Sequence, residues 1–112
     1  MIIDSHCHLE YEPLSKNLDS VVERALKNGV EYFLTISTTN KNFKKIIQII
    51  TKYPSIYGSY GIHPHESEAH SDINCSEILN NIKLSKKIIG IGETGLDFYY
   101  NRSKKDKQEN LF

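Results

Sequence analysis

Short apolar segments and longer amphipathic segments alternate four times along the chain. The apolar segments span residues 1–4, 32–37, 56–62 and 87–93, and their β-branched and aromatic side chains favour strands. Helical spacing of apolar residues follows the first three segments, and a polar segment that resembles the start of a helix follows the fourth. Strands separated by helices of this kind predict right-handed βαβ crossovers and a parallel sheet, so the pattern indicates an α/β fold.

Local signals define the ends of the predicted helices. The first helix carries an apolar stripe formed by Leu18, Val21, Val22, Ala25 and Leu26. Gly29 stands where a left-handed C-terminal cap is needed, and the second helix must end before Pro54. Asn74 is a candidate N-cap for the third helix, with Glu77 three residues later. The segment 87–93 has the clearest pattern of a buried strand.

The composition restricts the kinds of protein that fit this pattern. The chain has 112 residues, 14 Lys and Arg against 14 Asp and Glu, and a sequence pI near 7.0. A complete (β/α)8 barrel needs roughly 250 residues, and a neutral chain argues against non-specific adhesion to nucleic acid or membranes. No targeting or membrane segment is visible, and Cys7 and Cys75 define no disulfide framework. We therefore expect a reduced, cytoplasmic protein.

The first candidate for chemistry is a pair of histidines at the carboxyl end of the first predicted strand, where α/β proteins place their sites. His6 and His8 are two residues apart, so on an extended chain their side chains project from one face. Two neutral imidazoles side by side suit a Zn, Mn or Fe-type ion, and two structural histidines are the alternative. Cys7 points to the opposite face, so we expect it to pack under the helices.

Other polar residues follow the third and fourth predicted strands. Glu93 ends the fourth strand, where its carboxylate would bridge two metal ions or polarise a metal-bound water; pairing with a lysine or capping a turn is the alternative. His63 and His65 suit binding of an anionic substrate or proton relay, and solvated loop histidines are the alternative. We expect His70 to be a surface residue. The basic residues of segment 102–107 are predicted to lie on a solvated helix face, and contact with a phosphate backbone is the alternative.

Three sequence blocks, in family order, resemble the TatD family of metal-dependent deoxyribonucleases. The blocks are residues 3–9 (IDSHCHL), 61–65 (GIHPH) and 91–100 (IGETGLDFYY). The resemblance implies a TIM barrel that hydrolyses phosphodiester bonds in DNA with divalent ions, two in the full-length family, of Mg²⁺, Mn²⁺ or Zn²⁺. It also implies that one metal is bound by His6 and His8, that Glu93 bridges it to a second and is catalytic, and that the substrate side of the cleft is lined by His63 and His65.

The chain departs from the family pattern in its later metal ligands. In the family, two histidines and an aspartate from later strands complete the second metal site, but no histidine follows Glu93 here. We therefore expect residues 1–112 to be the amino-terminal half of a TatD-type domain, a truncated parallel (β/α)4 half of a TIM barrel with weak or no activity alone. The alternative is a non-catalytic half-barrel that acts only by association with itself or with a complementary half, because an open half-barrel exposes strand edges and an apolar inner face.

Overall fold

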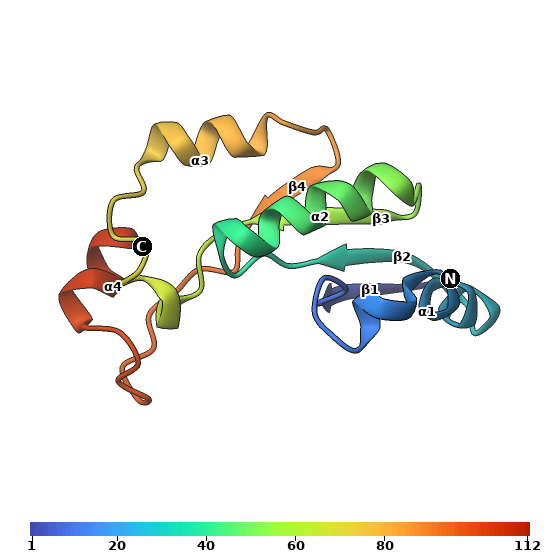
Figure 1. Ribbon diagram of the computed structural model, residues 1–112, viewed down its shortest axis with the longest axis horizontal. Coiled ribbons are helices and arrows are strands. Elements are labelled where there is room, and N and C mark those ends of the chain that lie inside the picture. The colour runs from blue at the N-terminus through green and yellow to red at the C-terminus, as the bar shows by residue number, and fades with distance from the viewer.

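The computed structural model describes residues 1–112, which form one parallel sheet with the strand order β1-β2-β3-β4. The strands are β1 (Ile2–Cys7), β2 (Val30–Thr35), β3 (Ile56–Tyr60) and β4 (Ile88–Ile91). The helices that alternate with them are α1 (Leu18–Lys27), α2 (Asn40–Lys52), α3 (Cys75–Ile82) and α4 (Lys105–Leu111) (Figure 1). Two short 3-10 turns are η1 (Leu14–Asn17) and η2 (Pro64–Glu66). The α/β architecture with four parallel βα units is confirmed.

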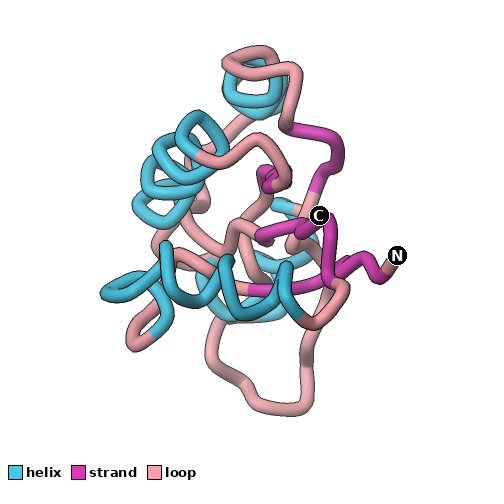
Figure 2. The backbone as a smooth tube through the Cα atoms, turned by 90° about the vertical axis from the view of Figure 1, so that its right-hand side faces the viewer, coloured by secondary structure: helices cyan, strands magenta, loops and turns pink.

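Helices α1, α2 and α3 lie together on one side of the sheet, and none of the three covers the opposite side (Figure 2). The hydrophobic core fills the layer between this side of the sheet and the helices. Its buried members are Leu9, Val22, Phe33, Phe43, Ile46, Ile49, Ile50, Ile56, Tyr60 and Ile88. No helix is both long enough and apolar enough to cross a membrane.

The helix ends follow the local signals in the sequence. Gly29, two residues after α1 ends at Lys27, has φ +85°, the left-handed conformation expected just after a helix. Helix α2 ends at Lys52, two residues before Pro54. The side-chain oxygen of Asn74 accepts a hydrogen bond from the Glu77 backbone N–H at 3.0 Å, as the N-cap prediction requires.

The strand that the sequence marked as the clearest buried strand is buried on one face only. In β4, Ile88 packs into the core, but Ile89 is 59% exposed and Ile91 is 65% exposed. The predicted strand is present, but its burial is confirmed for one face only, because side chains alternate between the two faces and only the helix-covered face has a packing layer. Ile3 and Tyr32 are exposed on the other strands as well.

Strand β1 is longer than the predicted segment 1–4, because it continues through the histidine motif to Cys7. Its pairing with β2 is irregular between Asp4 and Cys7, which lie opposite Phe33 and Thr35. The thiol of Cys7 donates to the Leu34 carbonyl oxygen at 3.4 Å and packs against the core, as predicted. Burial raises the pKa of this thiol to about 12, so the thiol stays protonated at neutral pH. Cys7 therefore acts as a packing residue.

Candidate metal centre

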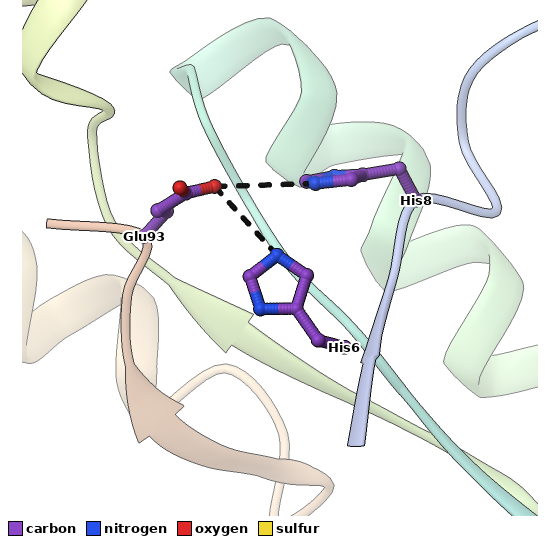
Figure 3. A group of neighbouring side chains, drawn as sticks. All are labelled: His6, His8 and Glu93. Atoms are coloured by element: carbon purple, nitrogen blue, oxygen red, sulfur yellow. Dashed lines mark ion pairs between the residues drawn. The ribbon is translucent and has the colours of Figure 1, made fainter. Parts of the chain in front are cut away.

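His6, His8 and Glu93 come from opposite edges of the sheet and meet at its carboxyl end (Figure 3). The Nε2 atoms of His6 and of His8 each lie 3.9 Å from Glu93 Oε2. One ligand atom from each of the three residues lies within 4.8 Å of the other two. Strands β1 and β4 are separated by two strands, so this convergence requires the curvature of the sheet (Figure 2).

Hydrogen bonds to β3 and to the segment that follows β2 hold Glu93 in place. Its N–H donates to the Ser37 carbonyl oxygen at 2.7 Å, just beyond the end of β2. The preceding residue, Gly92, donates to the Tyr60 carbonyl oxygen at 2.9 Å and accepts from the Ser59 hydroxyl at 2.6 Å. The carboxylate therefore projects from a main chain that is fixed on both sides of the Gly92–Glu93 peptide.

Gly61 allows the segment around Glu93 to approach the end of β3. A Cβ at position 61 would lie 2.5 Å from the Glu93 carbonyl oxygen and 2.7 Å from the Gly92 Cα. Both are backbone atoms, so no side-chain rotation would relieve the overlap. The glycine of the block 61–65 is thus explained by the close approach of its backbone to the backbone of Gly92 and Glu93.

The orientation of His8 is fixed by acceptors behind the ring. Its Nδ1 lies 3.1 Å from the Ile36 carbonyl oxygen and 3.3 Å from Glu10 Oε1, so the ring proton belongs on Nδ1. The lone pair of Nε2 then faces Glu93. The carboxylate of Glu10 is fully buried and accepts from the Thr35 hydroxyl at 2.8 Å.

Glu10 is a supporting residue that the sequence reasoning missed. The available signal was an acidic residue two positions after His8 in the first motif. Position alone does not distinguish a carboxylate behind a histidine from an exposed loop glutamate. Partners of this kind orient metal-binding histidines in many proteins and raise their basicity.

His63 faces Glu93 through a protonated nitrogen. Its Nδ1 accepts the backbone N–H of His65 at 3.1 Å, which places the ring proton on Nε2 in the neutral form. This Nε2 lies 3.5 Å from Glu93 Oε1. The arrangement suits hydrogen-bond donation to Glu93 or to a substrate oxygen, whereas a neutral metal ligand needs a free lone pair on this atom.

His65 is turned toward Asp97, another residue that the sequence reasoning did not select. His65 Nε2 lies 2.7 Å from Asp97 Oδ2, and this hydrogen bond holds the pKa of Asp97 below its usual range. The Asp97 backbone N–H donates to the buried side chain of Gln108 at 2.7 Å. The pair thus ties the loop after β3 to the loop after β4.

An open polar pocket of about 670 Å³ surrounds the three candidate ligands. The other lining residues are Tyr11, Thr38, His63, His65, Glu66 and Arg102. Arg102 precedes helix α4, so the prediction that it lies on a solvated helix face is wrong. His70 is partly exposed and lies outside the pocket, in agreement with its prediction as a surface residue.

The donor atoms of this site fit one divalent ion. Two imidazole nitrogens and a carboxylate oxygen are ligands that zinc, manganese and iron accept. The chain contains a single group of three or more such side chains close enough to share an ion. Glu93 Oε1 faces His63 and is the remaining carboxylate oxygen, so a second ion would need ligands from elsewhere.

Comparison with known proteins places these motifs in a family. The family model for TatD-related DNases matches residues 3–112. An uncharacterized metal-dependent hydrolase of Buchnera aphidicola (subspecies Acyrthosiphon pisum) is 36% identical over 99% of this chain. The 3'-5' ssDNA/RNA exonuclease TatD of Salmonella typhimurium is 30% identical, also over 99%. The crystal structure of the TatD homologue YjjV of Escherichia coli K12 superposes with a TM-score of 0.87 at 28% identity over 98% of this chain.

The matches are complete for this chain but partial for its relatives. This chain covers 45% of the Buchnera protein, 42% of the Salmonella protein and 43% of the YjjV structure. The chain thus spans somewhat less than half the length of the relatives it matches, and its four βα units correspond to half of a TIM barrel. On the family match and the shared fold together, this chain belongs to the TatD-related DNases.

Proposed function

We propose that this chain is the metal-binding half of a divalent-metal-dependent phosphodiesterase that acts on DNA. The observation that carries the proposal is the convergence of His6, His8 and Glu93 within 4.8 Å at the carboxyl end of the sheet. The name of the Salmonella relative, an ssDNA/RNA exonuclease, supports a nucleic acid substrate. Two free cysteines, Cys7 and Cys75, support a reducing compartment such as the cytoplasm.

In this proposal His6, His8 and Glu93 hold the ion, and the pocket around them receives the phosphodiester. A bound divalent ion, of Mg²⁺, Mn²⁺ or Zn²⁺, supplies positive charge that polarises the phosphate and favours attack by water. Glu93 Oε1, which lies away from the two imidazoles, accepts the proton of the attacking water. The Nε2–H of His63, 3.5 Å from this oxygen, donates to the carboxylate or to a non-bridging phosphate oxygen. His65 borders the same side of the pocket and is held by Asp97.

The ligand set limits what the chain does by itself. A two-metal centre uses one ion for the attacking oxygen and another for the departing oxygen, but the side chains present here suit only one ion. We therefore propose weak or absent hydrolysis by the isolated chain and a second ligand set contributed by a complementary half.

Calorimetric titration of the purified chain with Mn²⁺ tests the metal site. We expect one ion per chain, with binding lost in His6→Ala and Glu93→Gln and retained in the control His70→Ala. Hydrolysis of end-labelled single-stranded DNA is measured alongside, with and without EDTA. Absence of Mn²⁺ binding would contradict the proposal. Robust EDTA-sensitive hydrolysis that His6→Ala abolishes would show instead that one ion and these three ligands are sufficient.

The exposed inner face of the sheet favours a second candidate function, a non-catalytic half-barrel that acts by association. Ile3, Tyr32, Tyr57 and Ile89 line an apolar hollow of about 430 Å³ on this face. Strands β1 and β4 are both edge strands with unpaired backbone groups. A second copy of the chain, or a complementary half, would cover these groups and remove the apolar surface from water.

Sedimentation velocity tests the association candidate. We expect concentration-dependent self-association that Ile89→Lys reduces, because a charge on the inner face opposes its burial. Leu79→Lys is the matched control, since Leu79 is also exposed but belongs to α3 on the helical side. A stable monomer at all concentrations would remove the case for self-association.

A further inference from the structure

Three consecutive aromatic residues beside the candidate metal centre are exposed and do not belong to the hydrophobic core. Tyr99 is 84% exposed, Tyr100 is 61% exposed and Phe98 is 41% exposed. They lie in the loop between β4 and α4, which projects beyond the carboxyl end of the sheet (Figure 1). We refer to residues 98–100 as the aromatic loop. Exposed adjacent aromatics of this size are costly in water, so a ligand that stacks on them is favoured.

A continuous series of rings connects the aromatic loop to Glu93. The ring centroids of His63 and His65 are 4.5 Å apart, and those of His65 and Tyr100 are 5.8 Å apart. Tyr100 and Tyr99 follow at 4.9 Å. Each pair is T-shaped, so the outermost rings remain accessible for stacking. The series begins at the side chain that faces Glu93 Oε1 and ends in solvent.

The base of the aromatic loop is fixed by buried hydrogen bonds. The side chain of Gln108, only 1% exposed, donates to the carbonyl oxygens of Asp97 at 3.0 Å and Ser103 at 2.9 Å. The Ser103 hydroxyl donates to the His65 carbonyl oxygen at 2.7 Å. Asp97 Oδ1 accepts the backbone N–H of Tyr99 at 3.1 Å. These contacts pre-organise the loop, which lowers the entropic cost of binding a ligand.

Arg102 supplies a free positive charge at the same place. The neighbouring Lys104 pairs with Glu68 at 3.6 Å, and Lys105 pairs with Glu109 at 3.7 Å. Arg102 has no carboxylate within salt-bridge distance; its guanidinium carbon lies 6.0 Å from the Tyr100 ring centre, and the residue lines the metal pocket. A cation beside stacking aromatics is the combination by which proteins hold single-stranded nucleic acid.

We propose that the aromatic loop and Arg102 form a binding subsite for single-stranded nucleic acid, in which Tyr99 and Tyr100 stack on unpaired bases and Arg102 contacts the adjacent phosphate. The subsite rests on the proposed nuclease function and deepens it, because it would deliver the strand to the pocket of Glu93. It requires bases as well as phosphates, and it requires no metal ion.

Fluorescence anisotropy in EDTA with two labelled 12-mers tests the subsite, one of thymidine and one abasic with the same number of phosphates. We expect Tyr99→Ala and Tyr100→Ala to weaken binding of the thymidine strand by about tenfold and to leave the abasic strand unaffected. Phenylalanine at either position should retain binding, and leucine should not. Arg102→Gln should weaken binding of both strands. It should also reduce the slope of log affinity against log salt concentration by about 0.7. Tyr32→Ala and Arg24→Gln are the controls, and both should bind like the unmodified chain.

The outcomes separate this inference from the proposed function. Equal affinity for the two strands, unchanged binding by both tyrosine variants, or no binding by the unmodified chain would each overturn the subsite. A loss that phenylalanine does not restore would also overturn it, because the role would then be structural. The metal centre is judged independently by Mn²⁺ binding, which the tyrosine variants should leave unchanged.

Discussion

The Nδ1 atom of His8 lies 3.3 Å from Oε1 of Glu10, a carboxylate with no exposure to solvent. The pair keeps the ring proton on Nδ1, leaves the lone pair of Nε2 directed toward Glu93, and restricts the rotation of the ring. The two side chains belong to one short segment, because the candidate ligand His8 and the carboxylate behind it are separated by a single residue.

Glu10→Gln should weaken Mn²⁺ binding by about tenfold or more, because the variant retains the shape of the side chain but removes the charge behind His8. Calorimetric titration measures the effect. Glu12→Gln is the matched control, since Glu12 is exposed and pairs only with Lys16. Equal Mn²⁺ affinity in the two variants would show that Glu10 does not support the site.

Gly61→Ala should destabilise the fold by about 3 kcal/mol and displace Glu93, because the added methyl group meets backbone atoms of Gly92 and Glu93. Urea unfolding measures the stability, and Mn²⁺ titration measures the displacement. Gly90→Ala is the control, since the Cβ there meets only the Ser59 side chain at an ordinary 3.9 Å. A stable Gly61→Ala variant with normal Mn²⁺ affinity would contradict the close approach.

Asp97→Asn should change the pH dependence of stability on the acid side. The hydrogen bond from His65 lowers the folded pKa of Asp97 below its ordinary value of 3.8. The contribution of Asp97 is therefore present above about pH 4 and is lost as the pH falls through the lowered folded pKa. Urea midpoints at pH 7, 5 and 3 should show a difference between the two proteins that shrinks at pH 3. Asp72→Asn, which alters an exposed carboxylate, should show no such trend.

The two cysteines should react with a thiol reagent at very different rates. At pH 8 the Cys7 thiol, with its pKa raised to about 12 by burial, contains almost no thiolate, whereas Cys75 is exposed. We expect one thiol per chain to react promptly with a chromogenic disulfide and the second to react only after urea is added. Cys75→Ser should remove the fast phase. Two fast thiols in the folded chain would refute the packing of Cys7.

Much of the fold was predictable from local patterns. The helical stripe of α1, the glycine cap at Gly29 and the Asn74 cap are short-range features, and each is present where the sequence indicates it. The strand predicted at 87–93 is present as β4, but the exposure of one of its faces was not predictable, because an apolar segment has the same pattern whether one face or both are covered. Whether a face of the strand is covered depends on segments that are distant in the sequence, and no layer packs over Ile89 and Ile91.

The candidate site was predictable in part for a similar reason. His6 lies near the carboxyl end of β1, and His8, His63, His65 and Glu93 follow strands. Parallel strands bring their carboxyl ends to one edge of the sheet. Asp97, Gln108 and Arg102 were missed or misplaced because their roles depend on how the loop after β4 folds back on η2. No spacing rule indicates such a contact.

The sequence by itself determined the βα alternation, the motifs at the strand ends and the set of candidate metal ligands, because these depend on residue type and short-range spacing. The tertiary structure decided that β1 and β4, at opposite edges, bring His6, His8 and Glu93 within 4.8 Å. It also decided that one face of the sheet stays exposed and that Arg102 reaches the pocket. These features depend on the curvature of the sheet and on packing between distant segments. Both result from many weak contacts between residues that are far apart in the sequence.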